Sequence, residues 1–332
     1  MNSLFQGKTI LVTGGTGSFG KEFIKNALKE DAAKIIVYSR DEFKQFTMAN
    51  MPEFLPYKEK ISYIIGDVRD KERLIQAAKN TNYIVHAAAL KQVPACEYHP
   101  FEAIKTNVLG AENVIEAAIK NGVEKVVALS TDKACAPINL YGATKLCSDK
   151  LFIAANTCCY NEKTRFAVVR YGNVAGSRGS VIPFFQRLVS DGAEEIPVTD
   201  IRMTRFWLKL EQAVEIVFKA LTDMLGGELY VKKIPSMRMV DLAKAIAPKA
   251  AIKEIGVRPG EKIHEQMITA ADAPNTVDMG GYYVILPQIC LAETAQKYAN
   301  TKRVPADFEY NSGNNERWLT IEDMQKLISE IK

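Results

Sequence analysis

The residues most able to do chemistry lie between Ser130 and Lys145, which read STDKACAPINLYGATK. Tyr141 and Lys145 are four residues apart, so a helix over residues 141–150 places the phenol and the ammonium on one face. A nearby cation favours phenolate, and such a tyrosine can act as a base below its ordinary pKa of about 10. The pattern therefore predicts a proton-transferring Tyr141 assisted by Lys145.

Thr131, Asp132 and Lys133 directly follow the apolar run 126–129, which predicts a buried strand. Open parallel sheets bind ligands beyond the carboxyl ends of their strands, so these side chains are expected close to the tyrosine. Two interpretations of Asp132 and Lys133 remain open. They are either the acid and base of an elimination, or a local ion pair that caps the next turn.

The elements that must position these residues follow an alternating pattern. Over the first 170 residues, apolar segments at 8–12, 34–38, 61–65, 83–89, 125–129 and 166–170 alternate with helical patterns, which predicts an α/β fold with a doubly wound parallel sheet. Glycine, proline and arginine become frequent beyond Asn173, while 211–221 predicts a helix and 228–232 a strand returning to the sheet. The expected domains are a cofactor domain, 1–172 with return segments at about 206–232, and a smaller α/β substrate lobe, 173–205 and 233–332.

A glycine-rich turn separates the first strand from an amphipathic helix. Its spacing is G-x-x-G-x-x-G, which differs from the common G-x-G-x-x-G fingerprint. The physical purpose is the same, because glycines let backbone N–H groups and a helix N-terminus approach a pyrophosphate. The predicted dinucleotide-binding residues of this turn are Gly14, Thr16, Gly17, Ser18, Phe19 and Gly20.

The end of the second strand bears on which dinucleotide binds. An acidic residue there holds the ribose 2′-hydroxyl of NAD, whereas an arginine accommodates the 2′-phosphate of NADP. Ser39, Arg40 and Lys44 favour NADP, and Asp41 leaves the choice partly open. Lys91 is either a phosphate contact or a surface charge, and Asn107 either a buried structural residue or a proton relay. The other residues expected around the cofactor are Glu42, Asp67, Val68, Ala87, Ala88, Tyr141 and Lys145.

Arginines in the second part of the chain lie in loop-like contexts. Guanidinium groups bind phosphates in fork geometry, so a cluster of them suits a diphosphate, although a solvated basic face is the alternative. Residues 314–318 either fold over a substrate or pack as a tail. The predicted substrate residues are Lys91, Asn173, Arg178, Val181, Pro183, Thr199, Arg202, Arg205, Arg258 and Asn315.

The bulk composition limits the classes of partner. The chain has 332 residues, of which 47% are hydrophobic and 25% charged, as in ordinary globular proteins. A net charge of +4 gives little reason to expect nucleic acid or a membrane surface as partner, and no apolar run approaches the roughly 20 residues that span a bilayer. Six cysteines without paired spacing indicate reduced thiols and a cytoplasmic protein. The three histidines lack metal-binding spacing, so no metal site is expected.

The motifs TGGTGSFGK, YSRDE, GDVRD, HAAALKQVP, STDKA and NLYGATKL, followed by VVRYGNVAGSRGSVIPFF, DIRMTRFW, KIPSMRM and RPGEKIHE, together span nearly the whole chain. They resemble those of extended short-chain dehydrogenases/reductases that act on nucleotide sugars, and more narrowly the inverting UDP-N-acetylglucosamine 4,6-dehydratases. The resemblance implies a Rossmann-type fold, tightly bound and recycled NADP, and UDP-N-acetylglucosamine as substrate. It also implies the first step of pseudaminic acid synthesis and a homo-oligomer, a dimer or hexamer. Gln92 and Cys96 depart from the family pattern without touching the proposed chemistry.

The resemblance also implies roles for individual residues. Tyr141 is expected to remove the 4-hydroxyl proton as hydride passes to NADP, with Thr131 on the same oxygen and Lys145 lowering the tyrosine pKa. Lys133 then takes the carbon 5 proton, and Asp132 protonates the departing hydroxyl before hydride returns to carbon 6.

A lysine is a base only when neutral, so burial and nearby positive charge are expected to lower the Lys133 pKa. Retaining dehydratases carry glutamate at this position, so lysine implies inversion at carbon 5. The alternatives are a UDP-sugar 4-epimerase or dehydrogenase, which needs neither Asp132 nor Lys133, and a catalytically silent NADP-binding protein.

Overall fold

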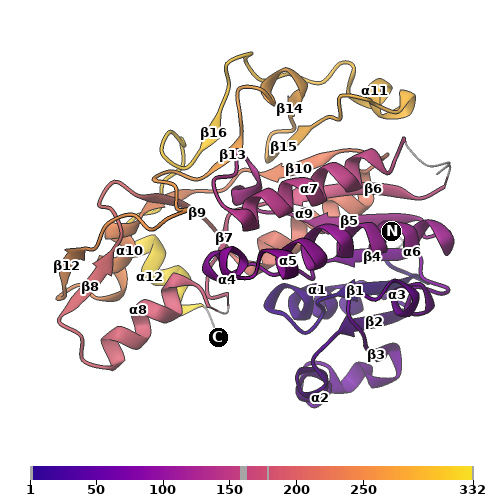
Figure 1. Ribbon diagram of the computed structural model, residues 1–332, viewed down its shortest axis with the longest axis horizontal. Helices are drawn as coiled ribbons and strands as arrows, with labels where there is room; N and C mark the ends of the chain where they lie inside the picture. The colour runs from indigo at the N-terminus through magenta and orange to yellow at the C-terminus, as the bar shows by residue number, and fades with distance from the viewer. Residues whose placement is uncertain (1–2, 158–162, 178, 331–332) are drawn as a thin grey trace.

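The computed structural model describes residues 3–157, 163–177 and 179–330. Its largest element is a nine-stranded sheet with the order β14-β15-β10-β6-β5-β4-β1-β2-β3 (Figure 1). The strands are β1 (Thr9–Thr13), β2 (Lys34–Ser39), β3 (Ile61–Ile65), β4 (Tyr83–His86), β5 (Lys125–Leu129), β6 (Arg165–Arg170), β10 (Leu229–Lys232), β14 (Thr276–Asp278) and β15 (Tyr282–Ile285).

The seven strands from β3 to β10 are parallel, and β15 and β14 extend the sheet in antiparallel fashion. The strand order reverses direction between β1 and β4, and open sheets of this kind bind ligands outside the carboxyl ends of the strands at such a point. The prediction of a doubly wound parallel sheet is confirmed.

Helices cover both faces of the sheet. On one face lie α1 (Ser18–Lys29) and α9 (Leu210–Asp223), and on the other α3 (Lys71–Ala77), α6 (Gly110–Lys120) and α7 (Leu140–Ala154). The predicted apolar stripe of α1 is real: Phe23, Ile24, Ala27 and Leu28 are all buried. Each fully buried large apolar side chain contributes about 1.5–3 kcal/mol, so such stripes hold the helices on the sheet.

The helical segment before β5 is interrupted. It consists of α5 (Pro100–Ile104), a π-helical turn η2 (Lys105–Leu109) and α6. Within the turn, Asn107 donates to Leu90 O (2.9 Å) and Thr144 Oγ1 (3.0 Å) and accepts from Leu90 N (2.8 Å). Asn107 therefore fastens the loop after β4 to α7. These contacts support the interpretation of Asn107 as a buried structural residue.

The smaller lobe has a core of its own and lies at the left of the sheet in Figure 1. It contains the helices α8 (Val181–Ser190), α10 (Met239–Ile246) and α12 (Ile321–Ser329). Its strands are β7 (Asn173–Val174), β8 (Glu195–Val198), β9 (Thr204–Leu208), β11 (Ser236–Arg238) and β12 (Ala251–Glu254). Strands β11, β9 and β7 form one small sheet, and β12 pairs with β8.

The boundaries between the domain of the large sheet and the smaller lobe differ from the expected ones. The β14–β15 hairpin comes from the stretch assigned to the lobe, yet it extends the large sheet beside β10. Conversely, β9 lies at the start of the expected return segment, yet it pairs with β7 and β11.

The remaining elements are α2 (Glu42–Ala49), η1 (Leu55–Lys60), α4 (Val93–Tyr98), η3 (Asp132–Ala134), β13 (Gln266–Ile268), η4 (Ala273–Asn275), α11 (Ala292–Tyr298) and β16 (Tyr310–Asn311). Within the described ranges, no helix has both the length and the hydropathy that crossing a bilayer requires.

Candidate active site

The turn η3 follows β5 and lies directly against the first turn of α7. Asn139 begins α7 by accepting a hydrogen bond from Gly142 N (2.7 Å), and its amide donates to Gly260 O (2.8 Å). A Cβ built on Gly142 would overlap Lys133 O, so only glycine permits this approach. The close approach brings Tyr141 beside the Thr131–Lys133 segment, as the sequence predicts.

Tyr141 and Lys145 both line one large cavity. Burial raises the pKa of Tyr141 to about 12, although Lys133 and a hydrogen bond with Thr131 oppose this shift. Burial also lowers the pKa of Lys145, against the attraction of Asp149. The expected lowering of the tyrosine pKa by Lys145 is wrong, because burial dominates and the opposing groups are Lys133 and Thr131.

Asp132 and Lys133 form an ion pair that includes a third residue, Glu265. The Lys133 amine lies 3.0 Å from Asp132 Oδ1 and 3.2 Å from Glu265 Oε1, and Arg205 Nε lies 3.7 Å from the same glutamate oxygen. Asp132 Oδ1 also accepts a hydrogen bond from Thr131 Oγ1 (3.0 Å). We call Asp132, Lys133 and Glu265 the open cluster, since Lys133 and Glu265 line the cavity.

The charges within the open cluster determine three pKa values. Burial raises the pKa of Asp132, and Glu265 adds to the rise despite Lys133 and Arg205. Burial works against the Lys133 ammonium, but the two carboxylates outweigh it and hold the Lys133 pKa above its ordinary value. Burial likewise opposes the Glu265 carboxylate, but Lys133, Arg205 and Lys262 outweigh it and lower the Glu265 pKa. The expected depression of the Lys133 pKa is therefore wrong, because its neighbours are mainly anionic.

Asp132 itself does not line the cavity, and its side chain is 1% exposed. Its proton can reach the cavity only by movement of the carboxyl or through a neighbour that does line it. Thr131 and Lys133 both bond to Asp132 Oδ1 and both line the cavity.

The large cavity has a volume of about 1080 Å³ and extends from the glycine-rich turn to the smaller lobe. Thr131, Lys133, Tyr141 and Lys145 lie along it. The predicted cofactor residues that line it are Gly14, Thr16, Gly17, Ser18, Phe19, Gly20, Ser39, Arg40, Asp41, Lys44, Asp67, Val68, Ala87, Ala88 and Lys91. Glu42, in the first turn of α2, is the predicted cofactor residue that does not.

The glycine-rich turn has the shape that a bound pyrophosphate requires. Gly14 has φ +66°, and a Cβ there would lie 2.9 Å from Ala88 N. A Cβ on Gly20 would lie 2.5 Å from Gly15 Cα, so helix α1 can approach the turn only because position 20 is glycine. The N-terminus of α1 begins after Gly17 with no side-chain cap, which leaves backbone N–H groups facing the cavity.

Charged residues surround the end of the cavity that lies next to β2 and α2. Asp41 caps α2 by accepting from Lys44 N (2.9 Å), and its carboxylate pairs with Lys44 Nζ at 2.6 Å. Arg40 is 54% exposed and lies 3.7 Å from Asp67, whose carboxylate is bound more closely by Arg69. Asp41 is thus occupied by its own helix, while Arg40 is only weakly held. Burial lowers the pKa of Lys91, which lies in the same cavity.

The predicted substrate residues divide into two groups. Lys91, Asn173, Val181, Thr199, Arg205 and Arg258 line the cavity, whereas Pro183, Arg202 and Asn315 do not. Pro183 lies on another side of α8 from Val181, Phe184 and Phe185. Arg178 lies outside the described residues.

Arg202 and Asn315 are held by other contacts. Arg202 bonds to both carboxylate oxygens of Asp200 (3.0 and 2.7 Å), and its side chain is 72% exposed. Asn315 donates to Ile234 O (2.8 Å) and Ser236 Oγ (3.0 Å), so it fastens the tail to the lobe. Arg205 does line the cavity, but it also donates to Thr204 O (2.7 Å) and Ile263 O (3.2 Å).

Glu265, which lines the cavity and contacts Lys133, is a site residue that sequence reasoning missed. It falls in the RPGEKIHE block, where the sequence offers no sign that its partner is Lys133. Tyr171, which follows β6, is a second cavity residue that was not predicted.

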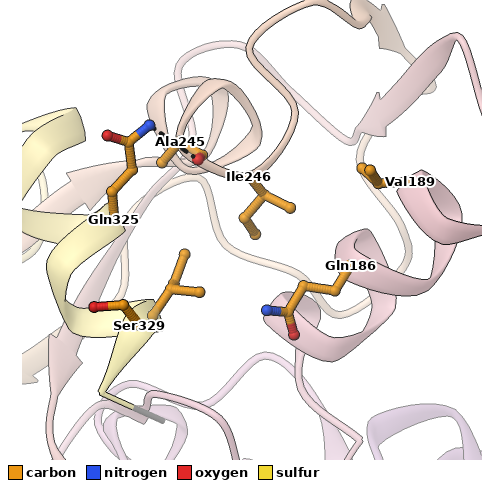
Figure 2. A pocket seen from close by; sticks show the side chains of 7 residues that line it. Gln186, Val189, Ala245, Ile246, Gln325 and Ser329 are labelled. Carbon is orange, nitrogen blue, oxygen red and sulfur yellow. Dashed lines mark hydrogen bonds between the residues drawn. The ribbon is translucent and has the colours of Figure 1, made fainter.

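A second cavity of about 270 Å³ lies in the smaller lobe between α8, α10 and α12 (Figure 2). Its lining residues are Gln186, Val189, Ala245, Ile246, Gln325, Ile328 and Ser329. In Figure 2, Gln325 turns back to donate to Ala245 O (3.3 Å). Because none of these side chains titrates, we place the chemistry in the large cavity.

Several known proteins are similar to this chain over nearly its full length. The family model described as "Polysaccharide biosynthesis protein" matches residues 10–287. A UDP-N-acetylglucosamine 4,6-dehydratase (inverting) from Campylobacter jejuni is 50% identical over 336 residues, covering 99% of each chain. A UDP-glucose 4-epimerase from Rickettsia akari is 40% identical and covers 98% of this chain and 96% of its own. The X-ray structure of Pen from Bacillus thuringiensis superposes with a TM-score of 0.89 at 36% identity, covering 98% of this chain and 99% of Pen.

Proposed function

The chain belongs to the polysaccharide biosynthesis protein family, and we propose that it converts UDP-N-acetylglucosamine to the 4-keto-6-deoxy sugar with inversion at carbon 5. One observation carries this proposal. The Lys133 amine, bonded to Asp132, lies beside Tyr141 in the cavity that also reaches the glycine-rich turn. The full-length similarity to an inverting UDP-N-acetylglucosamine 4,6-dehydratase supports it. The product is suited to the first step of pseudaminic acid synthesis.

We propose NADP as the cofactor, bound with its pyrophosphate on the Gly14–Gly20 turn. That turn fits the group, because glycine at positions 14 and 20 lets the turn pack against Ala88 and lets α1 approach it, which leaves the uncapped N-terminus of α1 facing the cavity. Arg40 and Lys44 line the cavity where a 2′-phosphate would lie, and Asp41 is engaged with Lys44. When bound, the nicotinamide supplies a hydride acceptor for carbon 4 and a hydride donor for carbon 6, so no net redox change occurs.

Tyr141 accepts the proton of the substrate's 4-hydroxyl in the first step, with Thr131 holding the same oxygen. Thr131 also bonds to Asp132 Oδ1 at 3.0 Å and to the Tyr141 phenol. Tyr141 holds this proton through the elimination, and Thr131 gives it a path back to Asp132 and Lys133 once the hydroxyl has left. One proton each comes from the 4-hydroxyl and from carbon 5, one leaves with the hydroxyl and one returns to carbon 5, so the protons balance over one turnover.

The elimination requires a neutral lysine and a protonated aspartic acid. Transfer of one proton from Lys133 Nζ to Asp132 within their 3.0 Å hydrogen bond yields both at once. The raised pKa of Asp132 favours this transfer, while the raised pKa of Lys133 opposes it. Lys133 then takes the carbon 5 proton as Asp132 supplies a proton to the departing hydroxyl, and the ion pair is restored.

The nucleotide end of the substrate is assigned to the lobe. Arg258 lines the cavity and its nearest carboxylate, Glu261, is 4.0 Å away, so it remains able to bind a diphosphate. Asn173, Val181 and Thr199 line the same region.

We also propose a homo-oligomer in which a second copy covers the apolar side chains exposed on α4, α5, η2 and the loop before α7: Tyr98, Phe101, Ile104, Leu109 and Ile138. Light scattering of the purified protein tests this assembly, and a monomer at all concentrations would contradict it.

The reaction itself is tested by incubating purified protein with UDP-N-acetylglucosamine and following the sugar by NMR. We expect loss of the 6-hydroxyl, a ketone at carbon 4 and inversion at carbon 5 without added cofactor. A product that keeps the 6-hydroxyl would instead indicate an epimerase like the rickettsial relative. Net consumption of added NADP would indicate a dehydrogenase, and binding of NADP without turnover a silent binding protein.

A further inference from the structure

The Lys133 amine is bound from two sides by parts of the chain that are far apart in sequence. Asp132 lies next to it, whereas Glu265 comes from the segment leading into β13. The glutamate backbone is fixed, because Glu265 N donates to Ser312 Oγ (2.9 Å) and Ser312 N donates to Glu265 O (2.7 Å). Its side chain is 3% exposed, so the carboxylate has little freedom to move away from Lys133.

A neutral lysine amine carries two N–H bonds and one lone pair in a tetrahedral arrangement. Directly after the proton has moved to Asp132, the lone pair faces the new hydroxyl of that residue. Once the amine turns about its terminal bond and donates its two hydrogens to Asp132 and Glu265, the lone pair must point in the remaining direction. The Lys133 side chain is 25% exposed and lines the large cavity, so that direction is the cavity. A base must be aimed at the proton it removes, and a third group commonly supplies that aim.

We propose that Glu265 is a positioning residue that, together with Asp132, directs the Lys133 lone pair at carbon 5 of the sugar. This inference rests on the proposed function, since it assigns a task to a residue beside the base of that reaction. Asp132 alone leaves the amine free to rotate about its terminal bond, so one anchor cannot fix the lone pair. The second anchor removes that freedom.

The two oxygens of the Glu265 carboxylate have different surroundings. Its Oε2 atom is buried and accepts no hydrogen bond from any described residue. A buried acceptor without a partner costs roughly 1–3 kcal/mol, so this carboxylate is retained at some expense to the fold. Its other oxygen contacts both Lys133 and Arg205, and the Arg205 charge offsets the pull that Glu265 exerts on the lysine proton.

Step-resolved kinetics of Glu265→Ala test the proposal. We expect reduction of the bound nicotinamide by the substrate to stay within about twofold of wild type, because that step uses Tyr141. Incorporation of solvent deuterium at carbon 5, and product release with it, should slow by about 10- to 100-fold, as misdirected catalytic groups commonly do. Equal slowing of both steps would mean that Glu265 only supports the fold, and unchanged deuterium incorporation would mean that it has no role.

Two further variants separate hydrogen bonding from charge and keep the test valid if the alanine variant does not fold. Glu265→Gln retains an oxygen that can accept from Lys133, so it should recover most of the lost rate. Glu265→Asp retains the charge but withdraws the carboxylate by one methylene, so it should be nearly as slow as alanine. If deuterium incorporation were fast in Glu265→Asp and slow in Glu265→Gln, Glu265 would act through its charge and the positioning role would be wrong.

Glu228→Gln is the matched control. Glu228 is also a buried glutamate, but it binds Leu225 N (2.8 Å) and Gly226 N (2.7 Å) outside the large cavity. Both steps should be unchanged in this variant. A wild-type protein that fails to form the 4-keto product refutes the proposed function itself, whereas the Glu265 inference fails only if the variants lack the step-specific loss.

Discussion

Two groups of charged side chains contact the chain just after β5, one at Ser130 and one at Asp132 and Lys133, and they differ in whether they reach the large cavity. One is the Asp149–Arg170 pair, joined at 3.2 Å and anchored by Ser130 Oγ (2.7 Å to Asp149) and Met267 O (2.8 Å to Arg170). The other is the open cluster of Asp132, Lys133 and Glu265. The side chains of Asp149 and Arg170 are 2% and 5% exposed, whereas Lys133 is 25% exposed.

The comparison indicates that carboxylates paired with basic side chains can stabilise the fold in one place and take part in a reaction in another. Asp149 and Arg170 do not line the cavity, so their charges hold α7 to β6, and Asp149 also favours the charged form of Lys145. Both groups leave buried polar atoms without partners among the described residues, namely Asp149 Oδ1 and Arg170 Nε in one and Asp132 Oδ2 and Glu265 Oε2 in the other. The open cluster differs because it has more carboxylates than its lysine can neutralise and because Lys133 and Glu265 line the cavity.

The largest expected effect comes from removing the base of the open cluster. Lys133→Met should reduce product formation by about 10²–10⁴-fold, since general bases contribute on that order. Cofactor reduction by UDP-N-acetylglucosamine should persist, because Tyr141, Thr131 and Lys145 are intact. Quenched-flow analysis of both steps measures this, and Lys133→Glu serves as a second variant. Full-rate formation of the inverted product by either would reject Lys133 as the base.

The next largest effect concerns the Asp149–Arg170 pair, and we expect it in the free energy of unfolding. Asp149→Asn leaves the Arg170 guanidinium buried without its counter-charge, and breaking a buried pair costs about 3–5 kcal/mol of unfolding free energy. Urea unfolding of the cofactor-bound protein measures the loss. Asp132→Asn is the matched variant, and it should lose far more turnover than stability. An Asp149→Asn protein that is as stable as wild type but inactive would contradict the assignment of the Asp149–Arg170 pair to stability.

The smallest effect extends the comparison to arginines at the surface. Arg258→Ala should raise the KM for UDP-N-acetylglucosamine by about 10- to 100-fold, because a charge-assisted hydrogen bond contributes about 1.5–3 kcal/mol. Arg202→Ala should change KM by less than about twofold, since its side chain is paired with Asp200 and lies outside the cavity lining. Steady-state kinetics of both variants measure this difference. Equal KM increases would place Arg202 at the substrate.

The residues near strand ends were predictable for a topological reason. The carboxyl ends of parallel strands meet at one edge, so Gly14 after β1, Arg40 after β2 and Thr131 after β5 converge once the alternating pattern is recognised. The helical spacing of Tyr141 and Lys145 adds only local geometry. The loops of the smaller lobe do not follow parallel strands of the large sheet, so this rule does not place their side chains. Arg202 and Asn315 resemble ligand-binding residues in sequence, but their partners are Asp200 and the Ile234–Ser236 segment.

The sequence by itself determined the parallel α/β sheet, the glycine-rich turn and the identity of the Asp132–Lys133 pair, because these depend on periodicity and on neighbours along the chain. Only the tertiary structure decided the charge state of that pair. Glu265 reaches Lys133 from a distant segment, and its carboxylate adds to that of Asp132 in raising the lysine pKa that burial alone would lower. Electrostatic energy depends on separation in space, and the fold alone sets the 3.2 Å between Lys133 and Glu265.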